Sequence, residues 1–243
     1  MRRMASSTTA RGVAAIVGVG SKLGRSIARK FAHEGYTVAI LARDLGRLSR
    51  FADEIAREEK AQVFAIRIDC SDSKSIREAF EGVLSLGFVE VMVYNAYYQL
   101  VSWNPTSFTD VKTDSLEKSL AVSSLGAFLC AQQVLPGMVE RRRGTILFTG
   151  RSASVCGIAG CGKFALRALS QCLSREFQSL GVHVAHIVID GVIGQSRGAS
   201  TSQGVMEPDE IAQTYWHLHV QDRSGWTEEI DLRPSITTFH YTH

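Results

Sequence analysis

The stretch Ala14–Phe31 most constrains what this chain can fold into. A run of small and branched apolar residues leads into three closely spaced glycines, Gly18, Gly20 and Gly24. Apolar residues then recur at helical spacing up to Phe31. A strand, a tight glycine turn and a helix in this order place backbone N–H groups and a helix N-terminus where a phosphate can bind. Because many turns use glycine, the motif gains weight only from the rest of the chain.

The same alternation of strand and helix continues to the C-terminus. Mainly apolar runs typical of buried parallel strands occur at residues 13–19, 37–41, 63–68, 89–94, 145–149 and 182–189, and we expect a last short strand near residues 230–232. Helical patterns fall between them, at residues 22–34, 44–60, from 73 onward, 113–138, 163–180 and 207–219. We therefore expect an α/β fold of the Rossmann type, with one doubly wound parallel sheet and helices on both faces.

No linker or repeat divides the chain, so we expect a single domain over residues 13–236. Residues 1–12 are expected to form a flexible N-terminus and residues 237–243 a C-terminal tail. The glycine- and serine-rich stretch 190–206 has no apolar period, and we expect a mobile loop there, over the carboxyl edge of the sheet.

Composition excludes several classes of function. A net charge of +3 over 243 residues gives little support to nucleic-acid binding. No apolar run approaches the roughly 20 residues that span a bilayer, so no membrane association is expected. Five cysteines without a CxxC pair predict reduced thiols and no metal site. We expect a cytoplasmic protein. The alternative is an organelle, if the basic, serine-rich N-terminus belongs to a transit peptide.

Two cations near the glycine turn indicate which nucleotide binds. Arg43 follows the second strand, where the adenosine ribose of a dinucleotide is expected, and an arginine there suits a 2′-phosphate. Lys22, inside the turn, adds a second cation near the same phosphate. These residues favour NADP(H) over NAD(H). The alternative is that both are ordinary surface cations.

At this point the chain resembles the short-chain dehydrogenase/reductase family over about residues 12–235. VGVGSKLG stands for the family's TGxxxGxG, with Lys22 in place of the middle glycine, and DCSD and YNAY stand for the adenine-contacting segment and for NNAG. KFALRALSQCLSREF matches the helix that begins with the catalytic lysine, and IDGVI replaces the PG motif beside the nicotinamide. The predicted cofactor-binding residues are Gly18, Gly20, Ser21, Lys22, Leu23, Gly24, Arg43, Asp69, Cys70, Asn95, Ala96, Lys163 and Ile193.

The resemblance fails at the catalytic residues. The family transfers a hydride between a nicotinamide and a carbonyl or alcohol, using tyrosine, lysine, serine and asparagine. Here Ala159 stands four residues before Lys163, and Ser123 takes the asparagine position. The serine position falls at Arg151 or at Ser152, with Ser154 a further candidate. The segment from 152 to 163 is shorter than usual and contains no tyrosine, so the catalytic candidates are Lys163, Ser152 and Ser154.

Two functions stay open. In the first, the protein is an NADP(H)-dependent reductase of a small carbonyl or alcohol substrate, with Tyr97, Tyr98 or a water relayed through Lys163 supplying the proton. The alternative, which we favour for either tyrosine, is apolar packing in an aromatic loop. In the second, the chain is a non-catalytic or shortened NADP(H)-binding homologue that acts as a nucleotide sensor or partner-binding protein. The resemblance also implies a homodimer or homotetramer through the helices 113–138 and 163–180. We interpret His183 and His186 as packing residues of a strand.

Overall fold

The structure, a computed structural model, describes residues 11–98, 111–152, 161–194 and 204–235. Ser154 and Ala159 lie outside these residues, as do the predicted C-terminal tail and all but two residues of the predicted flexible N-terminus.

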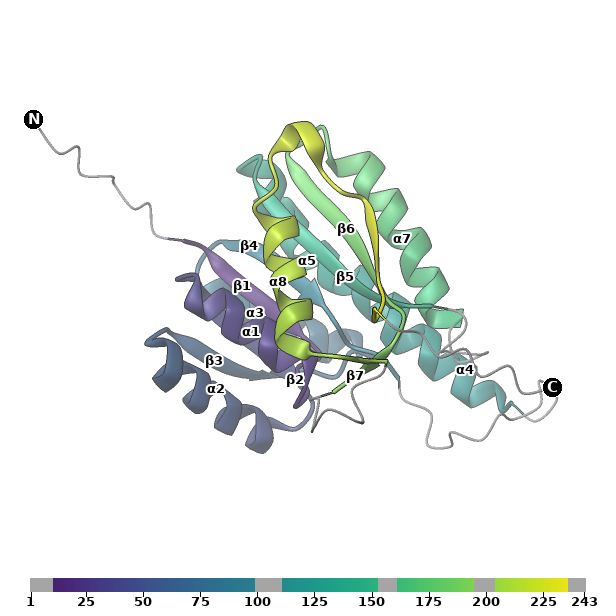
Figure 1. Cartoon of the computed structure of the whole chain (residues 1–243), viewed down its shortest axis with the longest axis horizontal. Coiled ribbons are helices and arrows are strands. Elements are labelled where there is room, and N and C mark those ends of the chain that lie inside the picture. Colours follow the sequence, from purple (N-terminus) through teal and green to yellow (C-terminus); the bar gives the residue numbers. More distant parts are fainter. Residues whose placement is uncertain (1–10, 99–110, 153–160, 195–203, 236–243) are drawn as a thin grey trace, which may run out of the picture.

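Seven parallel strands form one twisted sheet in the order β3-β2-β1-β4-β5-β6-β9 (Figure 1). The strands are β1 (Val13–Val17), β2 (Thr37–Ala42), β3 (Val63–Arg67), β4 (Val89–Tyr94), β5 (Gly144–Arg151), β6 (Val182–Ile189) and β9 (Glu229–Leu232). The chain runs outward from β1 to β3, then returns to the other side of β1 with β4. This reversal between β1 and β4 is the place where doubly wound sheets bind ligands. The predicted fold class is confirmed.

The central strand β1 is buried on both faces because every one of its side chains is apolar. Ala14 and Ile16 belong to one core cluster, while Val13, Ala15 and Val17 belong to the other. All five residues are at most 2% exposed. A continuous apolar run is what a strand between two helical layers requires.

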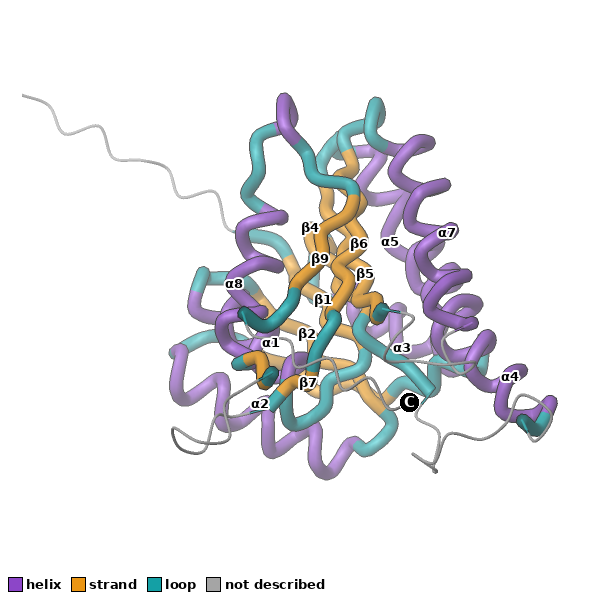
Figure 2. Tube along the Cα trace, turned by 45° about the vertical axis from the view of Figure 1, so that its right-hand side comes forward, coloured by secondary structure: helices purple, strands orange, loops and turns teal. Residues whose placement is uncertain are grey.

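Helices cover both faces of the sheet (Figure 2). One layer holds α1, α2 and α8, and the other holds α3, α5 and α7. The helical segments are α1 (Leu23–His33), α2 (Leu45–Glu59), α3 (Ser73–Ser85), α4 (Thr113–Leu120), η2 (Ala121–Leu125), α5 (Gly126–Glu140), α7 (Cys161–Phe177), α8 (Pro208–His219) and η4 (Arg223–Gly225). As predicted, Asp44 caps α2, since its Oδ1 accepts a hydrogen bond of 3.0 Å from the Arg47 N–H.

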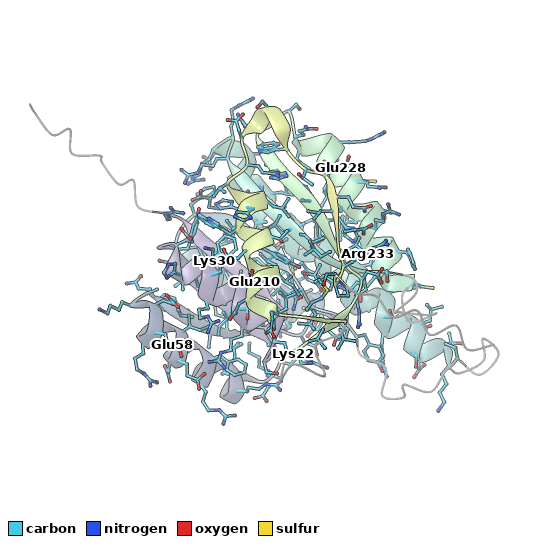
Figure 3. All side chains as sticks on the ribbon, viewed as in Figure 1. Lys22, Lys30, Glu58, Glu210, Glu228 and Arg233 are labelled. Carbon is cyan, nitrogen blue, oxygen red and sulfur yellow. The ribbon has the colours of Figure 1, made fainter. Side chains whose placement is uncertain are left out.

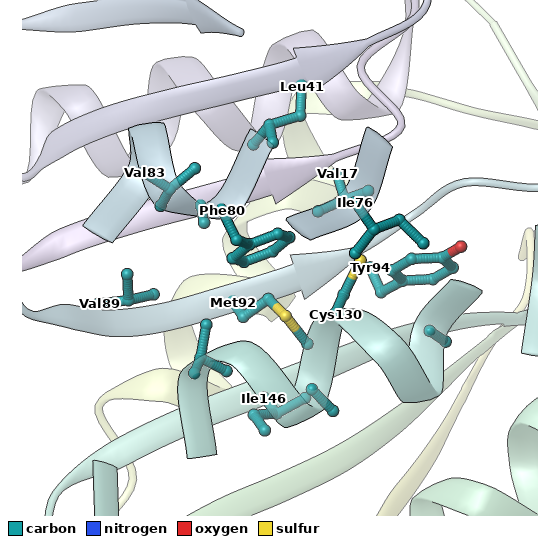
Figure 4. Close-up of a cluster of buried hydrophobic side chains, with 14 of the residues drawn as sticks. Val17, Leu41, Ile76, Phe80, Val83, Val89, Met92, Tyr94, Cys130 and Ile146 are labelled. Atoms are coloured by element: carbon teal, nitrogen blue, oxygen red, sulfur yellow. The ribbon is translucent and has the colours of Figure 1, made fainter. Parts of the chain in front are cut away.

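The core beneath α3 and α5 contains large side chains from several elements, including Phe80 of α3 and Met92 of β4 (Figure 4). Tyr94, at the end of β4, is fully buried there and donates its hydroxyl proton to the carbonyl oxygen of Val122. Val122 lies in η2, a π-helical turn between α4 and α5. A π-turn leaves backbone groups without their usual helical partners, and Tyr94 satisfies one of them.

The prediction of one uninterrupted helix over 113–138 is therefore wrong, because η2 divides it. The run Thr113–Glu140 is also long and apolar enough to cross a membrane, by length and composition only, which differs from the expectation that no such stretch exists. The side chains that α5 turns toward the sheet are buried in the core, and a core helix of this kind passes the same test.

The stretch 190–206 is not a simple loop where the structure describes it. The two-residue strands β7 (Val192–Ile193) and β8 (Val205–Met206) pair in parallel. Two residues each are too few to show an apolar period, so the sequence pattern could not predict them.

Candidate functional site

The glycine turn between β1 and α1 has the geometry of a phosphate site. Gly18 has a positive φ of 87°, and a Cβ there would lie 2.3 Å from the backbone nitrogen of Ala96. Only glycine allows this close approach. At Gly20, by contrast, a Cβ would meet nothing within 4 Å. The turn backbone therefore packs tightly against the residues that follow β4 at Gly18, and it has free space beside it at Gly20.

The helix that follows the turn leaves its N-terminus available. The N-cap residue, Lys22, makes no side-chain cap hydrogen bond, and the first turn of α1 contains no acidic residue. The first N–H groups of a helix have no intrahelical partner and bind anions. Leu23 turns its side chain into the core, so at this position only the backbone N–H can serve a ligand. These features fit the diphosphate of a dinucleotide.

The glycine turn is tied to two other loops of the same sheet edge. The Asn95 side-chain amide donates a hydrogen bond of 2.9 Å to the carbonyl oxygen of Gly18. Lys22 Nζ donates a hydrogen bond of 2.7 Å to the carbonyl oxygen of Ile193. The Lys22 ammonium is thus turned toward the segment after β6, where the nicotinamide end is expected. The sequence had predicted this ammonium near the same 2′-phosphate as Arg43, which lies beside the end of β2.

Arg43 and Asp69 lie close together at the carboxyl ends of β2 and β3. Arg43 is exposed. The hydrogen bonds from Ser71 lower the pKa of Asp69, and the charges of Arg43 and Arg67 lower it further. Cys70 lies deeper, and burial raises the pKa of its thiol to about 11. Its side chain belongs to the same core cluster as Tyr94.

Lys163 is buried at the start of α7. Its Nζ donates hydrogen bonds to the carbonyl oxygens of Thr149, at 2.7 Å, and Ala96, at 3.2 Å. Gly162 permits this placement, because a Cβ there would lie 2.4 Å from the Ser119 carbonyl oxygen of α4. The predicted catalytic lysine therefore joins the ends of β4 and β5.

Ser152 lies one residue beyond β5 and donates its hydroxyl proton to Asp190 Oδ1. Arg233 Nε lies 3.3 Å from Asp190 Oδ2. Figure 3 shows Arg233 just after β9, toward the end of the sheet that also carries Lys22, with Glu228 near the opposite end. The sequence placed Asp190 at this edge without giving it a role, and it did not predict Arg233. The signal for a role of Asp190 was an aspartate in IDGVI, where the family has its PG motif, and Arg233 carries no such signal.

Three further residues singled out from the sequence, Tyr97, Tyr98 and Ser123, differ in how far their side chains are exposed to solvent. Tyr97 is 45% exposed, and Tyr98 is half-buried. Ser123, at the asparagine position, is buried within η2.

Both strand histidines have partners that explain them. His183 stacks on Trp226 at 4.8 Å between ring centroids, and His186 Nδ1 lies 3.0 Å from Glu229 Oε2. Burial lowers the pKa of both imidazoles. Within the described part of the chain, no group of three histidine, cysteine or acidic residues is arranged to hold a metal ion.

Comparison with known proteins decides the family. The family model described as short chain dehydrogenase matches residues 12–202. The chain belongs to the short-chain dehydrogenase family. This confirms the resemblance drawn from the motifs.

Several short-chain dehydrogenase relatives cover nearly the whole chain. An uncharacterized oxidoreductase of Staphylococcus aureus (strain USA300) is 25% identical over 234 residues, which is 91% of this chain and 96% of the relative. The alcohol dehydrogenase of the archaeon Thermococcus sibiricus, solved with 5-hydroxy-NADP, is 26% identical with a TM-score of 0.80, covering 95% of this chain and 99% of that one. A short-chain dehydrogenase of Rhodopseudomonas palustris is 26% identical with a TM-score of 0.79, covering 92% and 98% of the two chains.

Proposed function

We propose that this short-chain dehydrogenase uses NADP(H) to interconvert a small carbonyl compound and its alcohol. The observation that supports this most is that three features lie at the same edge of the sheet. They are the glycine turn with free space at Gly20, the N-terminus of α1 without a side-chain cap from Lys22, and the buried ammonium of Lys163. A phosphate site and a buried cation at one switch point match a dinucleotide with its reactive end beside the lysine.

Arg43 would bind the 2′-phosphate of NADP(H). A carboxylate after the second strand selects NAD by accepting from the ribose hydroxyl, and an arginine accommodates the phosphate. The neighbouring carboxylate, Asp44, already accepts the Arg47 N–H at 3.0 Å as the cap of α2. Of Arg43 and Asp44, the Arg43 guanidinium is therefore the charged group that would bind at the ribose. The solved alcohol dehydrogenase of T. sibiricus, with its bound 5-hydroxy-NADP, supports the same preference.

Lys163 would hold the nicotinamide ribose and stabilise negative charge near the substrate oxygen. When bound, the nicotinamide supplies or accepts the hydride. The protein must then supply or accept one proton at the substrate oxygen, and a group within hydrogen-bond reach has to do this. Ser152 lies at the same sheet edge and would contact that oxygen.

We further propose that two copies of the chain associate through α4, η2, α5 and α7. Large apolar side chains are exposed on these elements, namely Leu120, Leu125, Phe128 and Phe164, at 38–54% exposure. An apolar set of this kind on adjacent helices marks a protein interface. A second copy presents the same set, as a symmetric dimer requires.

Steady-state turnover tests the proposed activity. Purified protein would be given NADPH with ketones, aldehydes and quinones, and NADP+ with alcohols, while absorbance reports the nicotinamide. We expect measurable oxidation of NADPH by at least one carbonyl class. Tight NADPH binding with no turnover across this panel would instead support the second function, a nucleotide-binding protein without catalysis, which the absence of the family's tyrosine favours.

A further inference from the structure

The carboxyl ends of β5 and β6 bring a hydroxyl and a carboxylate together. These strands pair in parallel over eight residues, ending with Arg151 opposite Ile189. Ser152 and Asp190 are the next residues on each strand, which places them side by side. Ser152 Oγ donates its proton to Asp190 Oδ1.

A third strand fixes the orientation of the carboxylate. The backbone N–H of Asp190 donates a hydrogen bond of 2.9 Å to the carbonyl oxygen of Leu232, in β9. Arg233, the next residue, lies 3.3 Å from Asp190 Oδ2, and its Nη2 lies 3.5 Å from Asp231. One carboxylate oxygen therefore faces a guanidinium and the other faces the serine hydroxyl. The Asp190 side chain is only 18% exposed, so the arrangement is partly shielded from water.

This hydrogen bond determines what Ser152 can offer a substrate. A serine hydroxyl has one proton and two lone pairs. Because the proton points to Asp190, Ser152 Oγ would meet a substrate hydroxyl as an acceptor and could take that hydroxyl's proton. The serine of this site is therefore set to take a proton, and a carboxylate stands behind it to receive one.

On the basis of the proposed function, we propose that Ser152 and Asp190 form the proton relay of this enzyme, in place of the absent tyrosine. Ser152 contacts the substrate oxygen, and Asp190 acts through Ser152. The substrate class is a secondary or primary alcohol and its carbonyl product.

The relay balances in both directions. In oxidation, the alcohol carbon loses a hydride to oxidised NADP, and the alcohol O–H bond breaks as its proton passes to Ser152 Oγ. Ser152 gives its own proton to Asp190 Oδ1, which becomes a neutral carboxylic acid and later releases the proton to water. In reduction, protonated Asp190 returns a proton through Ser152 to the oxygen while the hydride moves from NADPH to the carbonyl carbon.

Asp190→Asn tests the relay, because the amide keeps the shape but cannot take a proton. The matched control is Asp231→Asn, which removes the other carboxylate beside Arg233 and leaves Ser152 untouched. Probes are 1-phenylethanol and cyclohexanol with NADP+, and acetophenone and cyclohexanone with NADPH. We expect kcat to fall on the order of 10²–10⁴-fold in Asp190→Asn, as for loss of a general base, and to stay within about twofold in Asp231→Asn.

Further readouts separate a relay from a structural role. The NADPH dissociation constant and the thermal midpoint should be unchanged in Asp190→Asn. Asp190→Glu should restore part of kcat. The double variant Ser152→Ala/Asp190→Asn should be no slower than the slower single variant, because residues acting as one unit are not additive.

Unchanged kcat in Asp190→Asn alongside a slow Ser152→Ala variant would overturn the relay while leaving the oxidoreductase function intact. Loss of NADPH binding in Asp190→Asn would overturn it as well. A parent protein that binds NADPH and turns over none of the probes would overturn the relay together with the proposed function.

Discussion

The ammonium of Lys163 lies 2.7 Å from the carbonyl oxygen of Thr149, the sixth residue of β5. This contact holds the buried ammonium of Lys163 beside Thr149, which lies three residues before Ser152 in the chain. Burying an ammonium costs free energy, because the charge loses its hydration. Its retention at this edge indicates a functional reason.

Replacing Lys163 by methionine tests that reason. We expect kcat/KM to fall at least about 100-fold and NADPH to bind more weakly, while the thermal midpoint stays the same or rises, since a buried charge is removed. Lys74→Met, on the exposed side of α3, is the control. Unchanged turnover in Lys163→Met would remove the lysine from the catalytic site.

Gly18 and Gly20 give opposite predictions for the same substitution. Gly18→Ala forces a Cβ to within 2.3 Å of the Ala96 nitrogen at a φ of 87°, and we expect a loss of about 2–4 kcal/mol in the free energy of unfolding. Gly20→Ala meets no atom within 4 Å. Its methyl group enters only the space expected for the phosphates, so stability should hold while NADPH affinity falls about tenfold. Denaturant unfolding and fluorescence titration measure the two effects. A Gly20→Ala variant that binds NADPH normally would place the phosphates elsewhere.

His219 makes stability depend on pH. Its Nε2 lies 2.6 Å from the Tyr36 hydroxyl and its Nδ1 2.9 Å from Thr145 Oγ1. Burial lowers the pKa of this imidazole to about 4. Between that pH and the ordinary histidine pKa of about 6.5, the unfolded chain binds a proton that the folded chain does not.

Stability should therefore fall as pH drops from about 6.5 to about 4, by up to about 3 kcal/mol from this residue. Unfolding by urea at several pH values measures the slope, which His219→Gln should reduce. His33→Gln, at an exposed histidine, should leave it unchanged. Burial also lowers the pKa of His183 and His186, so part of the slope should persist in His219→Gln. An equal slope in parent and His219→Gln would contradict the account.

Association through the outer helices predicts that Phe128→Glu produces a monomer. Phe128 is 40% exposed on α5, and a carboxylate there would be buried unpaired in a dimer interface. Light scattering coupled to size exclusion measures the mass. Val220→Glu, at a similarly exposed position after α8, should retain the parent mass. A monomeric parent would contradict the association.

The sequence predicted most of the sheet because its inner strands are apolar or nearly apolar runs, such as Val13–Val17 and Val182–Ile189. The edge strand β9, with Glu229 and Asp231, has a weaker pattern. The interruption of the long helix at η2 was not predicted from the local pattern, and one contact made there comes from Tyr94, 28 residues before Val122.

The position of a residue at the sheet edge was predictable where a motif fixes the backbone, as at Gly18, and where a motif marks the start of a helix, as at Lys163. The role of Asp190 was not, because it depends on the register of β5 against β6, which brings it beside Ser152. The thiol of Cys70 illustrates the converse. A motif located the residue, but packing against Tyr94 determined which way its side chain faces.

Titration of the protein with NADPH and with NADH, followed by fluorescence, tests the central claim most directly. We predict tighter binding of NADPH, a preference lost in Arg43→Ala and retained in Arg57→Ala, which removes the same charge from the opposite end of α2. Equal or tighter binding of NADH by the parent protein, or no binding of either nucleotide, would contradict the account.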